Sequence, residues 1–286
     1  MRTSTLLRAA LTVLLAASCR APAPAASHAP PDPAQSVPAH HSFTLVSRVL
    51  AETRRIHLYT PPGYATAPDT RYPLLYVPDG GLDEDLPHLL RSVDAAIRAG
   101  DIRPVIVVGI ANTERRRDMT GPTQIAADRD IAPRVGGSAN FRAFLRDELM
   151  PEIARRVRSS GETAIIGESL AGLFIVETFL HAPDMFDAAI AISPSLWWND
   201  RSLVRGAAQA LQARPHRPST LFLTHAGDDD DGAIAALAQL LRRAAPTDLR
   251  LVFAPMPAEQ HSTIYRAVAP AALHAVFGTP RGAAPP

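Results

Sequence analysis

A serine flanked by small residues is the strongest candidate for chemistry in this chain. Residues 163–166 (TAII) run into residues 167–172 (GESLAG), and an apolar stretch follows. This order predicts a strand, a tight turn with Ser169 at its apex, and a helix. Such a turn brings neighbouring backbone close together, so it requires small residues two before and two after the serine. Gly167 and Ala171 meet this requirement, although glycine is more usual at the second position, and we predict that Ser169 is a nucleophile.

A serine nucleophile needs a base, and in hydrolases with this kind of turn the acid and then the histidine follow the serine along the chain. The histidines after Ser169 are His181, His216, His225, His261 and His274. His261 lies in the loop after the last predicted strand. Two of the others fall within helical patterns, one lies among prolines and arginines, and His225 directly precedes an acidic turn. We therefore predict His261 as the general base.

The acid is expected in the loop after the preceding strand, where four aspartates, residues 228–231, follow Gly227. Enzymes of this kind often place the acid three residues after the glycine. This spacing selects Asp230, and Asp228 is the alternative. Asp231 suits the N-cap of the next helix. The chosen carboxylate would orient His261 and stabilise its protonated form.

Two backbone N–H groups are needed to stabilise an oxyanion. One is expected from Leu170, the residue after the nucleophile. The second is expected from the loop after the strand at 74–77, where Gly80 or Gly81 lets the backbone approach a substrate. These glycines would otherwise serve only to form a turn.

The elements that must position these residues follow a strand–helix alternation. Apolar and polar residues alternate through an antiparallel hairpin from residue 43 to residue 60. Short apolar runs then predict buried strands at 74–77, 105–110, 164–166, 188–192, 221–223 and 251–253. Helical patterns lie at 86–97, 141–157, 170–180, 234–241 and 271–277, and Pro151 should kink or restart the second. This alternation predicts an α/β fold with a mostly parallel sheet covered on both faces.

Composition excludes several kinds of function. The chain has 286 residues, of which 47% are hydrophobic, and a formal net charge of +1, which gives no electrostatic support to a nucleic-acid partner. All 29 basic residues are arginine. A Ser-Lys dyad, a Schiff base and a phosphate-binding P-loop lysine are therefore excluded.

The N-terminus predicts export. Residues 1–19 have a basic start and a short apolar run that ends at Cys19, the single cysteine of the chain. They are similar to a bacterial lipoprotein signal, in which lipid is attached to this cysteine; an ordinary secretory signal is the alternative. Residues 20–42 are rich in proline and predict a flexible tether, and residues 43–286 would form the catalytic domain. The expected location is the periplasm or outer surface, with membrane contact only through Cys19.

Several segments together resemble the Putative esterase branch of the α/β-hydrolase superfamily, which includes enterochelin- and bacillibactin-type siderophore esterases and esterase D. They are residues 59–64 (YTPPGY), 72–76 (YPLLY) with Asp79-Gly80, 117–120 (RDMT), 166–173 (IGESLAGL) and 191–198 (AISPSLWW). The similarity covers about residues 43–280. Glu168 departs from the branch pattern, which commonly has histidine or another residue there, and four aspartates stand where the branch has a carboxylate after the glycine.

This resemblance implies an α/β-hydrolase fold and an enzyme that cleaves small carboxylic esters through an acyl-enzyme, without a metal or other cofactor. It also implies that Arg117 and Trp197 or Trp198 line the substrate cleft. Arg117 could instead form a local ion pair with Asp118, and the tryptophans could close the core. An acyltransferase, a non-catalytic surface binding protein and a serine peptidase remain alternatives. A catecholate siderophore lactone or another aromatic ester is the expected substrate.

Overall fold

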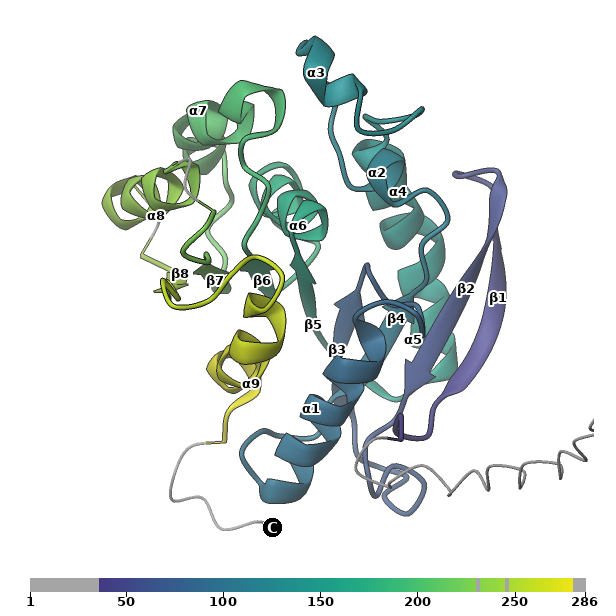
Figure 1. Cartoon of the computed structure of the whole chain (residues 1–286). Helices are drawn as coiled ribbons and strands as arrows, with labels where there is room; N and C mark the ends of the chain where they lie inside the picture. The colour runs from purple at the N-terminus through teal and green to yellow at the C-terminus, as the bar shows by residue number, and fades with distance from the viewer. Residues whose placement is uncertain (1–35, 230–231, 245–246, 280–286) are drawn as a thin grey trace, which may run out of the picture. The chain divides into compact units, whose positions relative to one another are not determined.

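Eight strands form one sheet in the computed structural model, which describes residues 36–229, 232–244 and 247–279 (Figure 1). The strands are β1 (His41–Ser47), β2 (Glu52–Tyr59), β3 (Tyr72–Val77), β4 (Ile106–Ile110), β5 (Ser159–Glu168), β6 (Ala188–Ile192), β7 (Ser219–Thr224) and β8 (Leu249–Phe253). Their order in the sheet is β1-β2-β4-β3-β5-β6-β7-β8. Strand β2 runs antiparallel to β1 and β4, and the other pairs are parallel. The predicted hairpin and mostly parallel sheet are confirmed.

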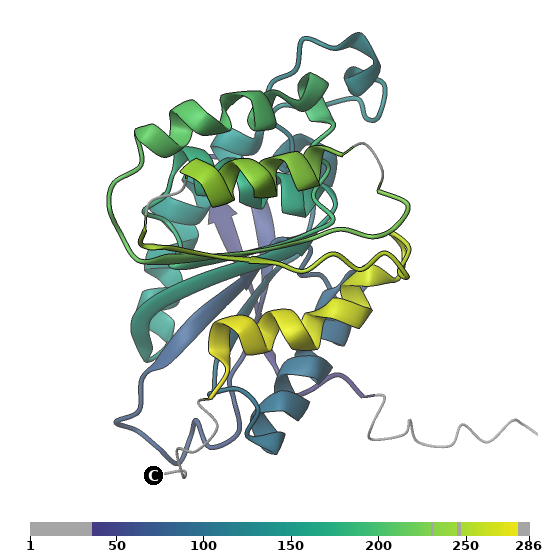
Figure 2. The same ribbon diagram turned by 90° about the vertical axis from the view of Figure 1, so that its left-hand side faces the viewer.

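Helices cover both faces of this sheet, as the edge-on view shows (Figure 2). Helices α1 (Leu86–Ala99) and α9 (Ile264–Phe277) pack on one face. Helices α4 (Ser138–Phe144), α5 (Met150–Arg156), α6 (Leu170–His181), α7 (Trp198–Gln212) and α8 (Ala233–Ala244) pack on the other. Each face buries its own apolar cluster, because residues of a fully buried strand point alternately to the two sides. None of the described helices is long and apolar enough to cross a membrane.

The predicted helix over 141–157 is formed by three consecutive pieces. A π-helical stretch, Leu145–Leu149, separates α4 from α5, and Pro151 is the second residue of α5, directly after that stretch. Helix α7 was not predicted. Its buried residues are few and widely spaced, so its sequence shows only a weak helical pattern. Left-handed backbone at residues 199–201 also interrupts its first turn.

Chain direction places the site at one edge of the sheet. The carboxyl ends of β3, β4, β5, β6, β7 and β8 lie together, because these strands are parallel. Two short helices, α2 (Arg115–Asp118) and α3 (Ala126–Arg129), lie in the long connection after β4. The predicted signal, Cys19, and Asp230 and Asp231 lie outside the described residues. Strand β1 begins at His41, within the segment predicted as tether.

Candidate active site

Ser169 occupies the turn between β5 and α6 in a strained backbone conformation. Its φ of 59° and ψ of −119° lie in a region that residues other than glycine rarely adopt. The turn is tight enough that a Cβ atom added at Gly167 would lie 2.6 Å from the Cβ of Ala171. Gly167 is therefore required, and the alanine at position 171 fits only because its partner lacks a side chain. The predicted strand, turn and helix are present, and the surrounding structure holds Ser169 at the apex in this strained conformation.

The imidazole of His261 is paired with Asp229. The Nδ1 atom of His261 lies 2.7 Å from Asp229 Oδ1, in the loop that follows β8. Asp228 has a different task, because its carboxylate accepts a 2.7 Å hydrogen bond from the backbone N–H of His261. Asp230, the acid selected by spacing, lies outside the described residues. The structure therefore directs Asp229 at the imidazole, a residue that the spacing argument passed over between its two candidates.

Asp229 is also held from its other side. Its Oδ2 accepts a 2.8 Å hydrogen bond from the backbone N–H of Ala226, and Ser193 contributes a further hydrogen bond. Burial alone would raise the pKa of Asp229, but the hydrogen bonds from Ser193, Ala226 and His261 outweigh it, so the pKa is lowered. Asp229 thus remains a carboxylate at neutral pH, as a group that stabilises a protonated imidazole must.

The hydroxyl of Ser169 lies beside the hydroxyl of a second serine, Ser195. Among the described residues, its hydrogen bond is a long one of 3.4 Å to Ser195 Oγ, and none joins it to His261. In structures without substrate, catalytic hydrogen bonds are often long or absent and tighten only on binding. His225, which directly follows β7, stacks on Phe253 and points Nδ1 at the carbonyl of Ala226. Its ring is engaged in the framework of the loop.

The N–H groups of Gly80 and Gly81, the two candidates for the second oxyanion donor, each donate to another acceptor. The N–H of Gly80 donates to Ile110 O at 3.0 Å, and a Cβ at Gly80 would lie 2.1 Å from Ile110 N. Gly80 therefore permits close packing. The N–H of Gly81 donates to Glu84 Oε2 at 2.6 Å. Leu170 is the first residue of α6, where an N–H has no carbonyl partner within the helix.

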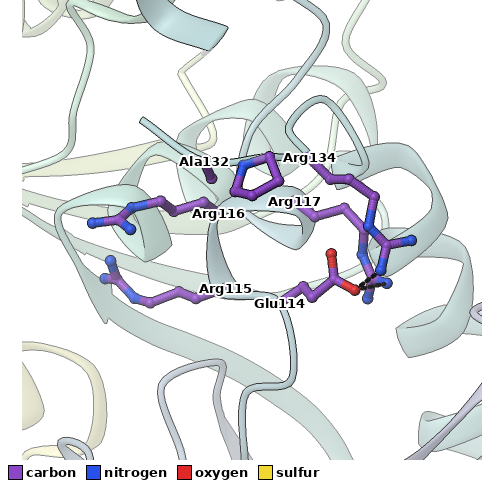
Figure 3. A pocket seen from close by; sticks show the side chains of 7 residues that line it. Glu114, Arg115, Arg116, Arg117, Ala132 and Arg134 are labelled. Atoms are coloured by element: carbon purple, nitrogen blue, oxygen red, sulfur yellow. Dashed lines mark hydrogen bonds and ion pairs between the residues drawn. The ribbon is translucent and has the colours of Figure 1, made fainter. Parts of the chain in front are cut away.

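An arginine-rich pocket of about 620 Å³ lies beside helix α2 (Figure 3). Its lining comprises Glu114, Arg115, Arg116, Arg117, Ala132, Pro133 and Arg134. Arg115 and Arg116 extend to one side, whereas Arg117 and Arg134 approach Glu114 on the other. Arg116 is exposed, and its guanidinium has no acceptor among the residues that the structure describes.

Arg117 lines this pocket, but its charge is already paired. Its guanidinium contacts Asp118 at 2.6 Å and Glu52 at 2.9 Å. Burial alone would lower the pKa of Arg117, but the hydrogen bonds to Asp118 and Glu52 outweigh it and raise the pKa. The local ion pair considered from the sequence is therefore present, and Arg117 belongs to the framework of the pocket wall.

The two tryptophans have opposite environments. Trp197 is 44% exposed, whereas Trp198 is 3% exposed and donates its Nε1–H to Gly121 O at 3.0 Å. Trp198 thus ties α7 to the connection after β4. Of the pair, only Trp197 presents a ring to solvent, so only Trp197 is placed to contact a ligand.

Glu168, the residue directly before Ser169, interacts with other acidic side chains. Burial, with the charges of Asp85 and Asp79, raises the pKa of Glu168 to about 8, and Arg115 opposes this shift. Burial also raises the pKa of Asp85 to about 6. One oxygen of Glu168 is buried without a hydrogen-bond partner among the described residues, which fits a carboxyl that is neutral at pH 7. The described residues contain no cluster of histidine, cysteine and carboxylate side chains arranged to hold a metal ion.

Little in the sequence indicates the contacts of Glu84, Arg115 and Ser195, which pair with Gly81, Asp79 and Ser169 in that order. Ser195 stands in a segment that resembles the esterase branch, but nothing local indicates that it meets Ser169. Arg115 is the first of three consecutive arginines, and only the orientation of α2 decides which of them points at the turn that carries Ser169.

Curated relatives are similar over part of their length. The chain is 27% identical over 188 residues to the ferri-bacillibactin esterase BesA of Bacillus subtilis, covering 60% of this chain and 65% of BesA. It is 28% identical over 161 residues to the iron(III) salmochelin esterase of Escherichia coli, covering 54% and 36%. The chain thus spans less than two thirds of these relatives.

Solved structures and a family model extend the similarity to most of the chain. An IroE-like serine hydrolase from Shewanella oneidensis superimposes with a TM-score of 0.76 at 25% identity, covering 84% of this chain and 80% of that one. The siderophore hydrolase EstB of Aspergillus nidulans has the same fold, with a TM-score of 0.71 at 22% identity and coverages of 85% and 96%. The model of the family described as Putative esterase matches residues 47–262. The chain therefore belongs to the Putative esterase family of the α/β-hydrolase fold.

Proposed function

We propose that this protein is a serine hydrolase of carboxylic esters that works through an acyl-enzyme, with Ser169 as nucleophile, His261 as base and Asp229 as acid. The observation that carries the proposal is the 2.7 Å pairing of His261 with an ionised Asp229 at the edge where the strained turn holds Ser169. Asp229 replaces Asp230 in the assignment made from spacing.

The first half-reaction forms the acyl-enzyme. Ser169 rotates from Ser195 toward His261, and its Oγ attacks the ester carbonyl carbon as His261 Nε2 takes the hydroxyl proton. The tetrahedral intermediate collapses as the bond to the alcohol oxygen breaks. The protonated His261 gives its proton to that oxygen, and the alcohol leaves. Asp229 holds the Nδ1–H tautomer throughout and offsets the charge of the imidazolium.

The second half-reaction restores the serine. A water molecule attacks the acyl carbon while His261 takes one of its protons, and collapse of this intermediate returns the proton to Ser169 Oγ and releases the acid. In both steps the N–H of Leu170 would donate to the oxyanion. Gly81 is our candidate for the second donor, which requires Glu84 to release it.

We propose that the substrate carries a flat aromatic acyl group with anionic or catecholate edges, as in a siderophore lactone. Relatives named as siderophore esterases support this class. The exposed ring of Trp197 can stack on a planar acid, and the arginine-lined pocket offers Arg116 as a cation that no described carboxylate occupies. Export, which we propose from residues 1–19, would place the protein where such a substrate is met.

Two measurements test the proposal. A fluorophosphonate should label the purified protein at Ser169 and should not label Ser169→Ala; labelling elsewhere, or none, would reject the mechanism. The values of kcat/KM should then be compared for a ferric catecholate trilactone, a feruloyl ester and a butyryl ester. A tenfold preference for the butyryl ester would reject the aromatic substrate and leave the mechanism in place.

A further inference from the structure

Arg115 makes a planar, two-point contact with the loop that follows β3. Its Nε lies 2.7 Å from Asp79 Oδ1, and its second guanidinium nitrogen, Nη2, lies 2.8 Å from Asp79 Oδ2. Asp79 is 4% exposed, and its Oδ1 also accepts a 2.7 Å hydrogen bond from Asn112 Nδ2. A buried carboxylate bound by a forked guanidinium has a fixed position and orientation, because both oxygens are engaged at once. Arg115 therefore fixes the start of the loop that carries Gly80 and Gly81.

The same guanidinium reaches the turn that carries the nucleophile. Nη2 of Arg115 also lies 3.4 Å from the backbone oxygen of Glu168, the residue directly before Ser169. One side chain thus contacts both segments whose backbone N–H groups would surround an oxyanion. The segments follow neighbouring strands, β3 and β5, and the guanidinium links them beyond the last paired residues of these strands.

Arg115 also balances charge at this point. Burial alone would lower the pKa of Arg115, but its hydrogen bond to Asp79 and the charges of Asp79, Asp85 and Glu84 outweigh it and raise the pKa. Arg115 in turn opposes the rise in the pKa of Glu168. Negative charge behind the turn would oppose the oxyanion that forms during ester cleavage. Arg115 contacts both Asp79 and the turn that carries Ser169. Its positive charge therefore offsets the negative charge of the carboxylates close to the expected oxyanion.

We propose that Arg115 is a positioning residue that sets the loop after β3 against the nucleophile's turn and thereby aligns the oxyanion donors. This inference rests on the proposed function, because it assigns Arg115 a role in the same reaction. The neighbouring Arg117 has no such role, since its guanidinium is bound to Glu52 and Asp118. Lysine cannot replace Arg115, because an ammonium cannot bind both oxygens of Asp79 in one plane and also reach Glu168 O.

The test compares Arg115→Lys with Arg103→Lys in the full-length protein. Arg103 forms an equivalent two-point pair with Glu162, which lies near the start of β5, at the far end of the strand from Ser169. Hydrolysis of a p-nitrophenyl ester gives kcat and KM, and a fluorophosphonate gives the rate of attack by Ser169. We expect Arg115→Lys to lower kcat and the labelling rate by at least about tenfold with KM within about twofold, because alignment of the oxyanion donors matters most in the transition state. Arg103→Lys should leave all three values near those of the wild type.

A change that only loosened the fold would lower the melting temperature and the amount of active protein, which titration of labelled Ser169 counts. The kcat values are therefore expressed per labelled site. Asp79→Asn, which keeps the shape of the partner, provides the second variant, and Arg115→Lys combined with Asp79→Asn should lose no more activity than the worse single variant. Equal kcat per site in Arg115→Lys and the wild type, or additive losses in the double variant, would overturn the inference. Failure of the wild type to be labelled at Ser169 would instead overturn the proposed function.

Discussion

His261 is held by two neighbouring aspartates through different atoms: Asp229 contacts its imidazole, and Asp228 accepts from its backbone N–H. The first contact orients the ring, whereas the second fixes the loop that carries it. Asp228 and Asp229 therefore make different contacts, although nothing in the sequence distinguishes them.

Replacing the orienting carboxylate should therefore cost far more than replacing its neighbour. We expect Asp229→Asn to lower kcat by about three to four orders of magnitude, because an amide favours the wrong imidazole tautomer. Asp228→Asn keeps an oxygen that accepts from the His261 N–H and should lower kcat by less than about tenfold. Steady-state hydrolysis of a p-nitrophenyl ester measures both. The reverse ranking would move the acid to Asp228, and full activity in both variants would reassign it to Asp230.

The two histidines near the site should differ in the same way. His261→Ala removes the base and should reduce kcat by several orders of magnitude, whereas His225→Ala loses only its stacking on Phe253 and its contact with Ala226 O. Circular dichroism establishes that both variants are folded. If His225→Ala proves to be the less active of the two, the base has been assigned to the wrong histidine.

The hydrogen bond from the Gly81 N–H to Glu84 should keep this N–H from reaching the oxyanion, and so should slow the reaction. A neutral amide at this position accepts more weakly than a carboxylate, by about 1 kcal/mol, so we expect Glu84→Gln to raise the rate of fluorophosphonate labelling about fivefold. Asp83→Asn, which removes the exposed carboxylate next in the chain, provides the control and should leave the rate unchanged. A slower reaction in Glu84→Gln would mean that Glu84 supports the loop and does not restrain its donor.

Glu168 should make activity fall at alkaline pH. Its pKa of about 8 keeps the carboxyl neutral at pH 7, and ionisation above pH 8 places a negative charge beside the oxyanion. We expect kcat/KM of the wild type to decline above about pH 8, and Glu168→Gln to lose that decline. A profile with the same alkaline limb in both proteins would assign the limb to another group.

Stability should respond to the same group. The folded protein binds the proton of Glu168 more tightly than the unfolded chain, whose carboxyl has the ordinary value of 4.5. The contribution of Glu168 to the free energy of unfolding is therefore present below about pH 4.5 and is lost as the pH rises toward 8. Melting temperatures measured from pH 5 to pH 9 should fall less steeply in Glu168→Gln than in the wild type.

Substitution of the two tryptophans should affect different properties: Trp198 the stability of the fold, and Trp197 the binding of substrate. Trp198→Ala opens a cavity and removes the hydrogen bond to Gly121 O, so we expect it to lower the free energy of unfolding by about 3–5 kcal/mol. Trp197→Ala should leave the melting temperature within a few degrees of the wild type and raise KM for a feruloyl ester more than for a butyryl ester. Equal effects of Trp197→Ala on the two esters would remove Trp197 from the substrate site.

Local patterns in the sequence were sufficient for the sheet and for the turn that carries Ser169. The alternation of buried strands with helices predicts the α/β class, and the small residues around Ser169 predict its turn, because both depend on residues adjacent in the chain. Helix α7 escaped prediction because left-handed backbone in its first turn and its sparse buried residues weaken the helical pattern.

The choice among equivalent side chains was decided only by the tertiary structure. Four consecutive aspartates, three consecutive arginines and two adjacent tryptophans each offer the same chemistry along the chain. Backbone direction in a loop or short helix turns Asp229 toward the imidazole of His261, Arg115 toward Asp79 and Trp197 toward solvent. Asp228 instead binds the backbone of His261, Arg117 binds Asp118, and Trp198 is buried. That direction is set by contacts with strands and loops far away in sequence, so composition and spacing alone do not contain it.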